Sequence, residues 1–214
     1  MNKFCRNPEI LFELLHRVLI EIPLSKVDIV YVFGQSIQNQ PSSLNRAVVL
    51  WKKGIAPLVG IPELKPVQDC AGFAACRSTL LKQGVPKKSI IAVKMALNDF
   101  PPSTDAEASG LVKLAKKIGW EKIIITSPPI HQFRAFISTI SAVNRDGLPD
   151  LKVFNCVGFP LEWCKQTVHS QGIETGLMRD LLISGELVKI LTYRSRGDLV
   201  SAEEALEYLN RRDS

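Results

Sequence analysis

The sequence lacks the features that mark several common classes of protein. No run of apolar residues approaches the roughly 20 that a membrane-spanning helix needs. Residues 1–25 carry charged side chains among the apolar ones, so they contain no signal-peptide core. These absences predict a cytoplasmic protein that does not enter a membrane.

Residues for metal and disulfide sites are scarce. The chain has five cysteines and three histidines, and no two cysteines have the C-x-x-C spacing of zinc and redox sites. We therefore interpret the cysteines mainly as small buried or half-buried apolar residues in a reducing compartment. They are Cys5, Cys70, Cys76, Cys156 and Cys164. No metal site is expected.

The two standard phosphate-binding loops are missing as well. Neither G-x-G-x-x-G nor G-x-x-x-x-G-K-[ST] occurs in the 214 residues, which argues against a standard dinucleotide or P-loop site. The net charge of +6 permits attraction to phosphate-bearing partners. However, the basic residues are scattered rather than gathered into an arm, so nucleic-acid binding is not expected.

What the sequence does contain is an alternation of apolar strands and amphipathic helices. Asn7 as N-cap and Pro8 at the first position open an N-terminal helix. The predicted strands are 27–34, 56–61, 89–94, 122–126 and 151–159. The predicted helices between them are 44–53, 68–83, 104–118 and one that contains Phe133 to Ile140; two more, 175–193 and 202–211, follow.

Several of these strands are apolar without alternation, which is typical of parallel strands covered by helices on both faces. The sequence therefore predicts an α/β fold with a mainly parallel sheet of about five strands. The strand pattern stops between Pro160 and Gly172. We expect residues 1–160 to form the core, with its N-terminal helix, and residues 161–214 to form a helical extension that packs on it.

The loop after the first predicted strand contains Gly34, Gln35 and Ser36. In folds of this type, ligands bind at the carboxyl ends of the strands. Backbone N–H groups and short polar side chains in this loop would suit a ligand. An ordinary polar turn explains the same residues, and the sequence leaves both interpretations open.

Thr104 and Glu107 have the spacing of a capping box directly before an apolar-periodic run. Ser201 and Glu204 repeat this spacing at the last predicted helix, away from any predicted strand end. Spacing alone therefore favours capping. The position of Thr104 and Glu107 at the ligand edge of the sheet favours a functional role instead.

His131 and Arg134 share one side of a predicted helix. With Ser127 as N-cap and Pro128 at the first position, His131 lies in the first turn. A solvated polar face would explain both residues. A cation in a first turn is disfavoured by about 0.3–1 kcal/mol, and either an arriving anion or Glu107 would offset that cost. Histidine beside a carboxylate is a candidate general acid or base, with Arg134 holding an anionic group.

Nucleophilic catalysis has weaker support in the sequence. Ser36, Ser127 and Cys70 lie in or near the relevant loops, but none stands in a G-x-S-x-G elbow. We do not expect one of them to act as a nucleophile.

The order of these features resembles the YdcF/SanA/ElyC-like family, a bacterial group catalogued as a domain of unknown function. The matching features, between about Val27 and Phe159, are Gly34, Arg46, Thr104-x-x-Glu107-Ala108, Thr126-Ser127 and His131-x-x-Arg134-Ala135. The resemblance implies a Rossmann-like fold whose shared polar residues gather at the carboxyl edge of the sheet, with Arg46 turned into the same cleft. The chain departs from the family at "VGIPEL", where a small-residue turn is usual, and we expect an unanchored member, unlike the envelope-associated ones.

Together these observations predict a protein that binds a small anionic or nucleotide-like ligand at the carboxyl edge of the sheet. Transfer or hydrolysis of a phosphate-containing group is the enzymatic form of this hypothesis. The expected ligand-binding residues are Gly34, Gln35, Ser36, Arg46, Thr104, Ser127 and Arg134, and the expected catalytic pair is His131 and Glu107. No cofactor is identified. The alternative is a non-catalytic interaction protein in which these residues form a structural polar network, and the helical tail is a candidate for self-association.

Overall fold

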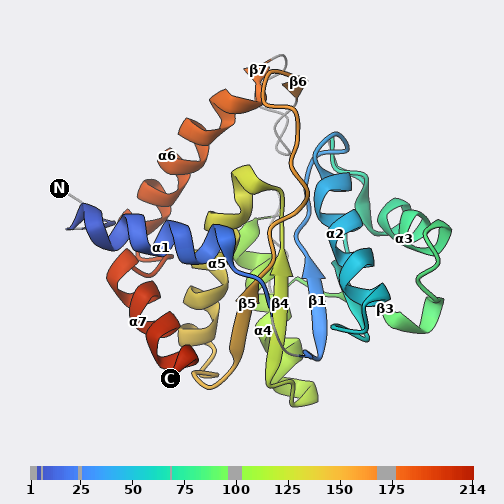
Figure 1. The fold of residues 1–214 in the computed structure, drawn as a ribbon, viewed down its shortest axis with the longest axis horizontal. Helices are drawn as coiled ribbons and strands as arrows, with labels where there is room; N and C mark the ends of the chain where they lie inside the picture. Colours follow the sequence, from blue (N-terminus) through green and yellow to red (C-terminus); the bar gives the residue numbers. More distant parts are fainter. Residues whose placement is uncertain (1–3, 6, 24–25, 68, 96–102, 168–176) are drawn as a thin grey trace.

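Five parallel strands form the central sheet of the protein (Figure 1). The computed structural model describes the chain except residues 1–3, 6, 24–25, 68, 96–102 and 168–176. The strands are β1 (Ile29–Val32), β2 (Val59–Pro62), β3 (Ile90–Val93), β4 (Lys122–Thr126) and β5 (Lys152–Asn155). Their order is β3-β2-β1-β4-β5, and each neighbouring pair is parallel. The predicted α/β class and parallel sheet are confirmed, and the arrangement is Rossmann-like.

The helices cover both faces of this sheet, as predicted. They are α1 (Pro8–Ile20), α2 (Gln40–Lys52), α3 (Gly72–Lys82), α4 (Thr104–Ile118), α5 (Pro129–Arg145), α6 (Leu182–Ser195) and α7 (Ala202–Asp213). Short 3-10 turns occur at η1 (Lys87–Ser89) and η2 (Arg179–Leu181), and β6 (Gln166–Thr167) pairs with β7 (Leu177–Met178) in a small antiparallel sheet.

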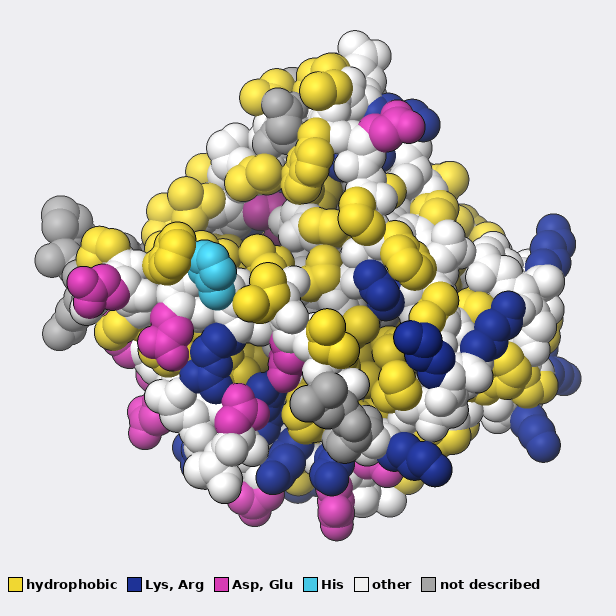
Figure 2. Space-filling model, viewed as in Figure 1, with side chains coloured by type: hydrophobic (Ala, Val, Ile, Leu, Met, Phe, Trp, Pro, Cys, Tyr) yellow, Lys and Arg dark blue, Asp and Glu magenta, His cyan; other side chains and the backbone are white. Residues whose placement is uncertain are grey.

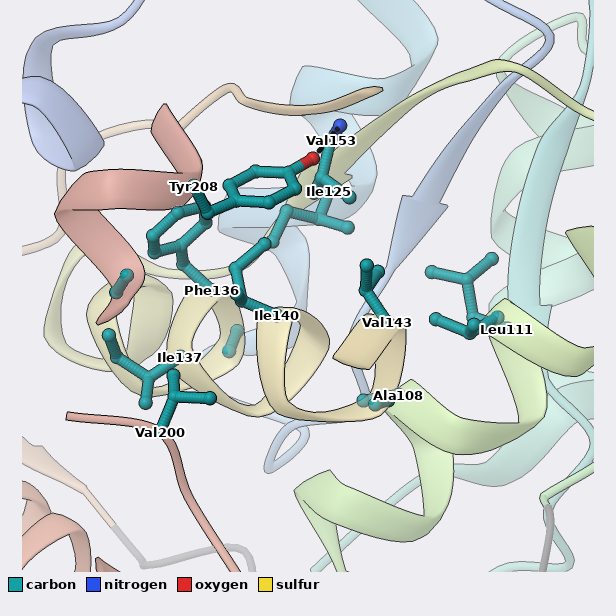
Figure 3. Close-up of a cluster of buried hydrophobic side chains, with 14 of the residues drawn as sticks. Ala108, Leu111, Ile125, Phe136, Ile137, Ile140, Val143, Val153, Val200 and Tyr208 are labelled. Carbon is teal, nitrogen blue, oxygen red and sulfur yellow. Dashed lines mark hydrogen bonds between the residues drawn. The ribbon is translucent and has the colours of Figure 1, made fainter. Parts of the chain in front are cut away.

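Two hydrophobic clusters, one on each face, hold these layers together. Successive strand residues point to opposite faces, so Ile123 and Ile125 pack with α1, α4, α5 and α7, while Ile124 packs with α2 and α3. Figure 3 shows part of the first cluster, in which Phe136 and Ile140 of α5 lie next to Tyr208 of α7, whose hydroxyl reaches Val153 of β5. The apolar strands are buried because helices cover both of their sides.

The strand order reverses between β1 and β4, because the chain crosses back over the sheet after β3. Such a switch point is where open α/β sheets bind ligands. The segments that leave β1 and β4, beginning at Phe33 and Ser127, therefore flank the expected ligand position.

Several predicted helix boundaries were wrong. Helix α2 begins at Gln40 rather than at residue 44, because Pro41 in its first turn suits a helix start. Helix α5 begins at Pro129, one residue later than predicted, with Pro128 rather than Ser127 at the N-cap position. The helix predicted for 175–193 is α6, from Leu182 to Ser195, and is preceded by β7 and η2; residues 175 and 176 lie outside the described residues.

The two sequence motifs with capping-box spacing, at Thr104 and at Ser201, differ in whether they cap a helix. Ser103, not Thr104, is the N-cap of α4, and its hydroxyl accepts a hydrogen bond from the backbone N–H of Ala106. The capping-box interpretation of Thr104 and Glu107 is therefore wrong. Ser201 and Glu204 do form the reciprocal capping box at α7. The Thr104 and Glu107 side chains are thus left for other contacts.

Candidate functional site

Polar side chains from three segments meet at the carboxyl edge of the sheet, beside the switch point. His131 and Arg134 come from the first turns of α5, Thr104 from the start of α4, and Gln35 from the loop after β1. Glu107, one turn further along α4, lies next to this cluster and bonds to Gly34 and Tyr31. All but Thr104, which is half-buried, are buried. The fold brings these residues together although Gln35 and His131, whose side chains are in contact, lie 96 positions apart.

His131 lies at the centre of this cluster and is only 3% exposed. Its Nδ1 lies 2.8 Å from the Gln35 amide nitrogen and 2.5 Å from Ser127 Oγ, and its Nε2 lies 3.1 Å from Thr104 Oγ1. With the amide nitrogen facing Nδ1, this ring nitrogen accepts, so the hydrogen lies on Nε2 and is donated to Thr104. The alternative of a solvated helix face for His131 and Arg134 is therefore wrong.

Arg134 is 6% exposed and links this cluster to the C-terminal helix α6. Its Nη1 donates to Thr104 Oγ1 at 2.5 Å, while Nε and Nη2 donate to the two carboxylate oxygens of Glu186 at 2.5 and 3.0 Å. Burial lowers the pKa of Arg134, but Glu186, with smaller effects of Tyr193 and Glu107, more than offsets this and leaves the pKa above its usual value. Lys189 lies 3.5 Å from the same carboxylate.

Glu107 is buried beneath the loop that follows β1. Its carboxylate accepts hydrogen bonds from the backbone N–H of Gly34 at 2.9 Å and from the Tyr31 hydroxyl at 3.2 Å. Burial raises its pKa to about 7, although these hydrogen bonds and the charge of Arg134 act in the opposite direction. Glu107 therefore changes its charge near neutral pH.

Gly34 permits the close approach of this carboxylate. A Cβ atom at position 34 would lie 3.2 Å from Glu107 Oε1, which is tighter than an ordinary contact. The carboxylate uses the N–H of Gly34, and the N–H of Gln35 donates to the Gln40 side chain at 2.7 Å. A ligand would have to replace these contacts in order to use the two N–H groups.

Ser36 and Arg46, the other expected ligand residues, contact different groups. Ser36 is buried next to Cys70, and its Oγ has no hydrogen-bond partner among the described residues. Arg46 Nε donates to the Val157 carbonyl at 2.8 Å, and its guanidinium lies 4.1 Å from the centre of the Phe159 ring. The recorded contacts of Arg46 are thus with the segment after β5 and not with the His131 cluster.

Little free space remains between α6 and the described residues of the cluster. A cavity of only about 10 Å³ lies among Gln35, Asn39, His131, Arg134, Leu182 and Glu186. Leu182 and Glu186 belong to α6, so this helix covers the cavity on the side opposite the sheet edge. Among the described residues, a ligand larger than water could enter this cavity only after α6 moves.

The arrangement suits anion binding and proton transfer better than nucleophilic attack. The Ser127 hydroxyl is close enough to His131 to exchange a proton, but Ser127 is 0% exposed and packed beneath the helix. Thr104 Oγ1 accepts from His131 and Arg134, so its own hydrogen is left to donate. In the described part of the chain, no three His, Cys, Asp or Glu side chains are grouped as metal ligands.

Sequence reasoning missed two residues of the site. In the sequence, Tyr31 looks like one more apolar residue of a strand. Only its hydrogen bond to Glu107 in the structure places its hydroxyl at the site. Glu186 lies 52 residues after its partner Arg134, in a helix with several exposed apolar residues. The cation that we expected to meet an arriving anion is therefore already paired with a carboxylate of the chain itself.

No family model, curated protein or solved structure matches this chain. Among the residues that the structure describes, no helix is long and apolar enough to cross a membrane. The fold is thus established by the structure, while the resemblance to the YdcF/SanA/ElyC-like family rests on the motif residues alone.

Proposed function

We propose that the protein binds a small anionic ligand, such as a phosphate or carboxylate group, on Arg134 at the carboxyl edge of the sheet. The observation that carries this proposal is the bidentate pair of Arg134 with Glu186, 2.5 and 3.0 Å long, beside His131 and Thr104. This activity fits the family resemblance, which we retain as part of the proposal together with a cytoplasmic location.

Glu186 marks the position that the ligand takes. Planar guanidinium groups bind carboxylates and phosphates through two parallel hydrogen bonds, and Glu186 already makes both. An external anion replaces it when α6 moves away. The anion then lies next to the Thr104 hydroxyl, which is left to donate, and near the imidazole of His131.

In the enzymatic form of the proposal, the bound group is a phosphate that is transferred or hydrolysed. His131 Nε2 and Arg134 Nη1 both contact the Thr104 hydroxyl. A ligand bound to Arg134 would therefore lie near His131 Nε2, which could move a proton to or from it. Glu107 supplies a second titrating group near neutral pH. No nucleotide specificity is assigned.

Replacement of Glu186 by glutamine tests the proposal directly. The variant keeps the shape of the side chain but removes the competing charge, so affinity for inorganic phosphate, measured by isothermal titration calorimetry, should rise about tenfold or more. The Glu186→Gln, Arg134→Lys double variant should lose this gain, because lysine cannot form the bidentate pair.

A second, half-buried ion pair provides the control. Glu21 pairs with Arg212 at 2.5 Å near the end of β5, so Glu21→Gln also weakens an ion pair that is largely shielded from water. It should lower the melting temperature without raising phosphate affinity. If Glu186→Gln binds phosphate no better than the parent protein does, the anion-binding proposal is wrong.

A non-catalytic protein with a structural polar network is the second candidate function. The observation in its favour is that Glu186 already satisfies Arg134 inside a cavity of about 10 Å³. Removing one partner of a buried pair typically costs about 3–5 kcal/mol. A large loss of stability in Glu186→Gln with no gain in anion binding would favour this function.

A further inference from the structure

An apolar groove lies on the other side of the Arg134–Glu186 pair. It has a volume of about 470 Å³, within the range of about 300–1,000 Å³ that is typical of small-molecule sites. Its walls come from α1, α5, α6 and the segment after β5, and include Leu15, Leu19, Phe133, Trp163, Ile183 and Leu187. Figure 2 shows hydrophobic side chains gathered on this face, over α6 and above α1.

The groove is apolar along its length and charged at one place. Among the described residues that line it, Arg134 and Glu186 are the charged ones. The same two residues, with Ile130, also line the small polar cavity next to His131. The Arg134–Glu186 ion pair therefore lies between the apolar groove and the candidate anion site and lines both.

We propose that the groove holds the hydrocarbon chain of a single-chain anionic amphiphile, a long-chain carboxylate, whose head group binds Arg134. This inference rests on the proposed anion binding at the same arginine and names the class of ligand. A hydrophilic anion would leave the groove walls exposed to water, whereas a hydrocarbon chain covers them.

The exchange of head groups requires no new geometry at Arg134. The incoming carboxylate takes the two hydrogen bonds that Glu186 makes now, so one carboxylate replaces another. Glu186 has Lys189 as a second cation 3.5 Å away on the same helix. Lys189 thus adds a second positive charge near Arg134, and it can hold Glu186 when an anionic head takes its place.

The open side of the groove accounts for exposed apolar residues on two helices. Leu19 of α1 and both Ile183 and Leu187 of α6 line the groove and are 39%, 51% and 51% exposed. A chain that lies between α1 and α6 contacts all three. Occupation of the groove thus removes from water side chains that the protein alone leaves accessible.

A chain-length series tests the inference on the intact protein. Acetate, octanoate, decanoate and dodecanoate are titrated calorimetrically below their micelle concentrations. Each added methylene should lower Kd by up to about fourfold until the groove is filled. Dodecanol, which has the chain without the charge, should bind at least about tenfold more weakly than dodecanoate.

Two neighbouring positions on α6 provide matched variants. Leu187 lines the groove, whereas Val188, 61% exposed, does not. Leu187→Glu should weaken dodecanoate binding about tenfold or more, because it places a carboxylate against the chain. Val188→Glu should leave it unchanged.

The outcomes separate this inference from the anion-binding proposal. If phosphate binds as expected in Glu186→Gln but dodecanoate binds no tighter than acetate, the groove inference is overturned and anion binding stands. If dodecanol binds as tightly as dodecanoate and phosphate does not bind, both are overturned. If sedimentation velocity finds a dimer that Leu187→Glu dissociates, and dodecanoate does not bind, the groove is a self-association surface and the inference fails.

Discussion

Glu107 is the residue whose ionisation most directly links the site to solution conditions. Its neighbours are the Gly34 N–H, the Tyr31 hydroxyl and the charge of Arg134. Burial outweighs these favourable contacts and sets its pKa at about 7, above the usual 4.5. The same burial, together with Glu107, raises the pKa of Tyr31 well above its normal value.

We predict that stability falls between about pH 5 and pH 7 because of this carboxyl group. The folded protein holds the Glu107 proton up to about pH 7, whereas the unfolded chain releases it near pH 4.5. The free energy of unfolding therefore decreases as the pH rises through this range, by up to about 3 kcal/mol, and then levels out.

Urea denaturation of the parent protein and Glu107→Gln at several pH values measures this effect. Glutamine can still accept from Gly34 and Tyr31 but does not titrate, so the difference in stability between variant and parent should shift in favour of the variant as the pH rises to about 7. A difference that does not change with pH would contradict a raised pKa at Glu107.

Part of the site could be predicted at this scale, because strand ends in a parallel sheet meet at one edge. That rule placed Gln35, Thr104, Ser127, His131 and Arg134 together, as the hydrogen bonds place them. The rule says nothing about the partner of a buried cation. That partner is determined by which helix packs over it.

At the scale of single elements, the start of α4 depends on a close contact between helix and sheet. A Cβ atom at Gly110 would lie 2.1 Å from the carbonyl oxygen of Lys94, just after β3. The absence of a side chain at this position lets α4 approach the sheet closely. This approach helps to position Glu107 and Thr104, about one and two turns earlier on the same helix.

We predict that Gly110→Ala destabilises the protein by about 1–3 kcal/mol or more, because the contact is with backbone that cannot rotate away. Gly185, also inside a helix, is the matched control, since a Cβ atom there would meet nothing within 4 Å. Gly185→Ala should be neutral or stabilise by up to about 1 kcal/mol. Thermal unfolding of both variants measures the difference, and equal melting temperatures would contradict the steric argument.

The N-termini of the helices differ in how well the local sequence predicts them. Asn7 caps α1 as predicted, because its side chain accepts from the N–H of Glu9 within the same turn. The capping box at Ser201 is equally local. At α4 the same spacing was misleading, because Ser103 supplies the cap and the sheet edge draws Glu107 to Gly34 instead. Local patterns therefore predict helix ends well where no tertiary contact competes.

At the scale of the whole molecule, the two ends of the chain close the free edge of the sheet. Strand β5 is an edge strand, and such edges expose unpaired backbone groups. Tyr208 of α7 donates to the Leu151 carbonyl at 2.6 Å and accepts from the Val153 N–H at 2.7 Å (Figure 3). Arg212 donates to the Val153 carbonyl, and Glu21, just after α1, accepts from the Asn155 N–H.

The C-terminal helices therefore contribute to the core as well as extending it. Helix α7 packs against α1 and α5, and Tyr208 and Leu209 belong to the same hydrophobic cluster as the sheet. A domain boundary near residue 160 stays a prediction. The hydrogen bonds between Tyr208 and β5 could not be predicted, because the sequence around a helical tyrosine does not indicate which strand its hydroxyl will contact.

We predict that Tyr208→Phe lowers the free energy of unfolding by about 1–3 kcal/mol, because the buried N–H of Val153 and carbonyl of Leu151 each lose a partner. Tyr193→Phe on α6 is the control, since the Tyr193 hydroxyl makes no hydrogen bond among the described residues and its loss should cost less than about 0.5 kcal/mol. Urea unfolding compares the two variants.

Hydrogen exchange should localise the effect of Tyr208→Phe. The Val153 amide should lose protection in this variant, while the amides of β1, at the centre of the sheet, keep theirs. Equal stability of the two variants would mean that α7 holds β5 through apolar packing and that the hydroxyl adds nothing.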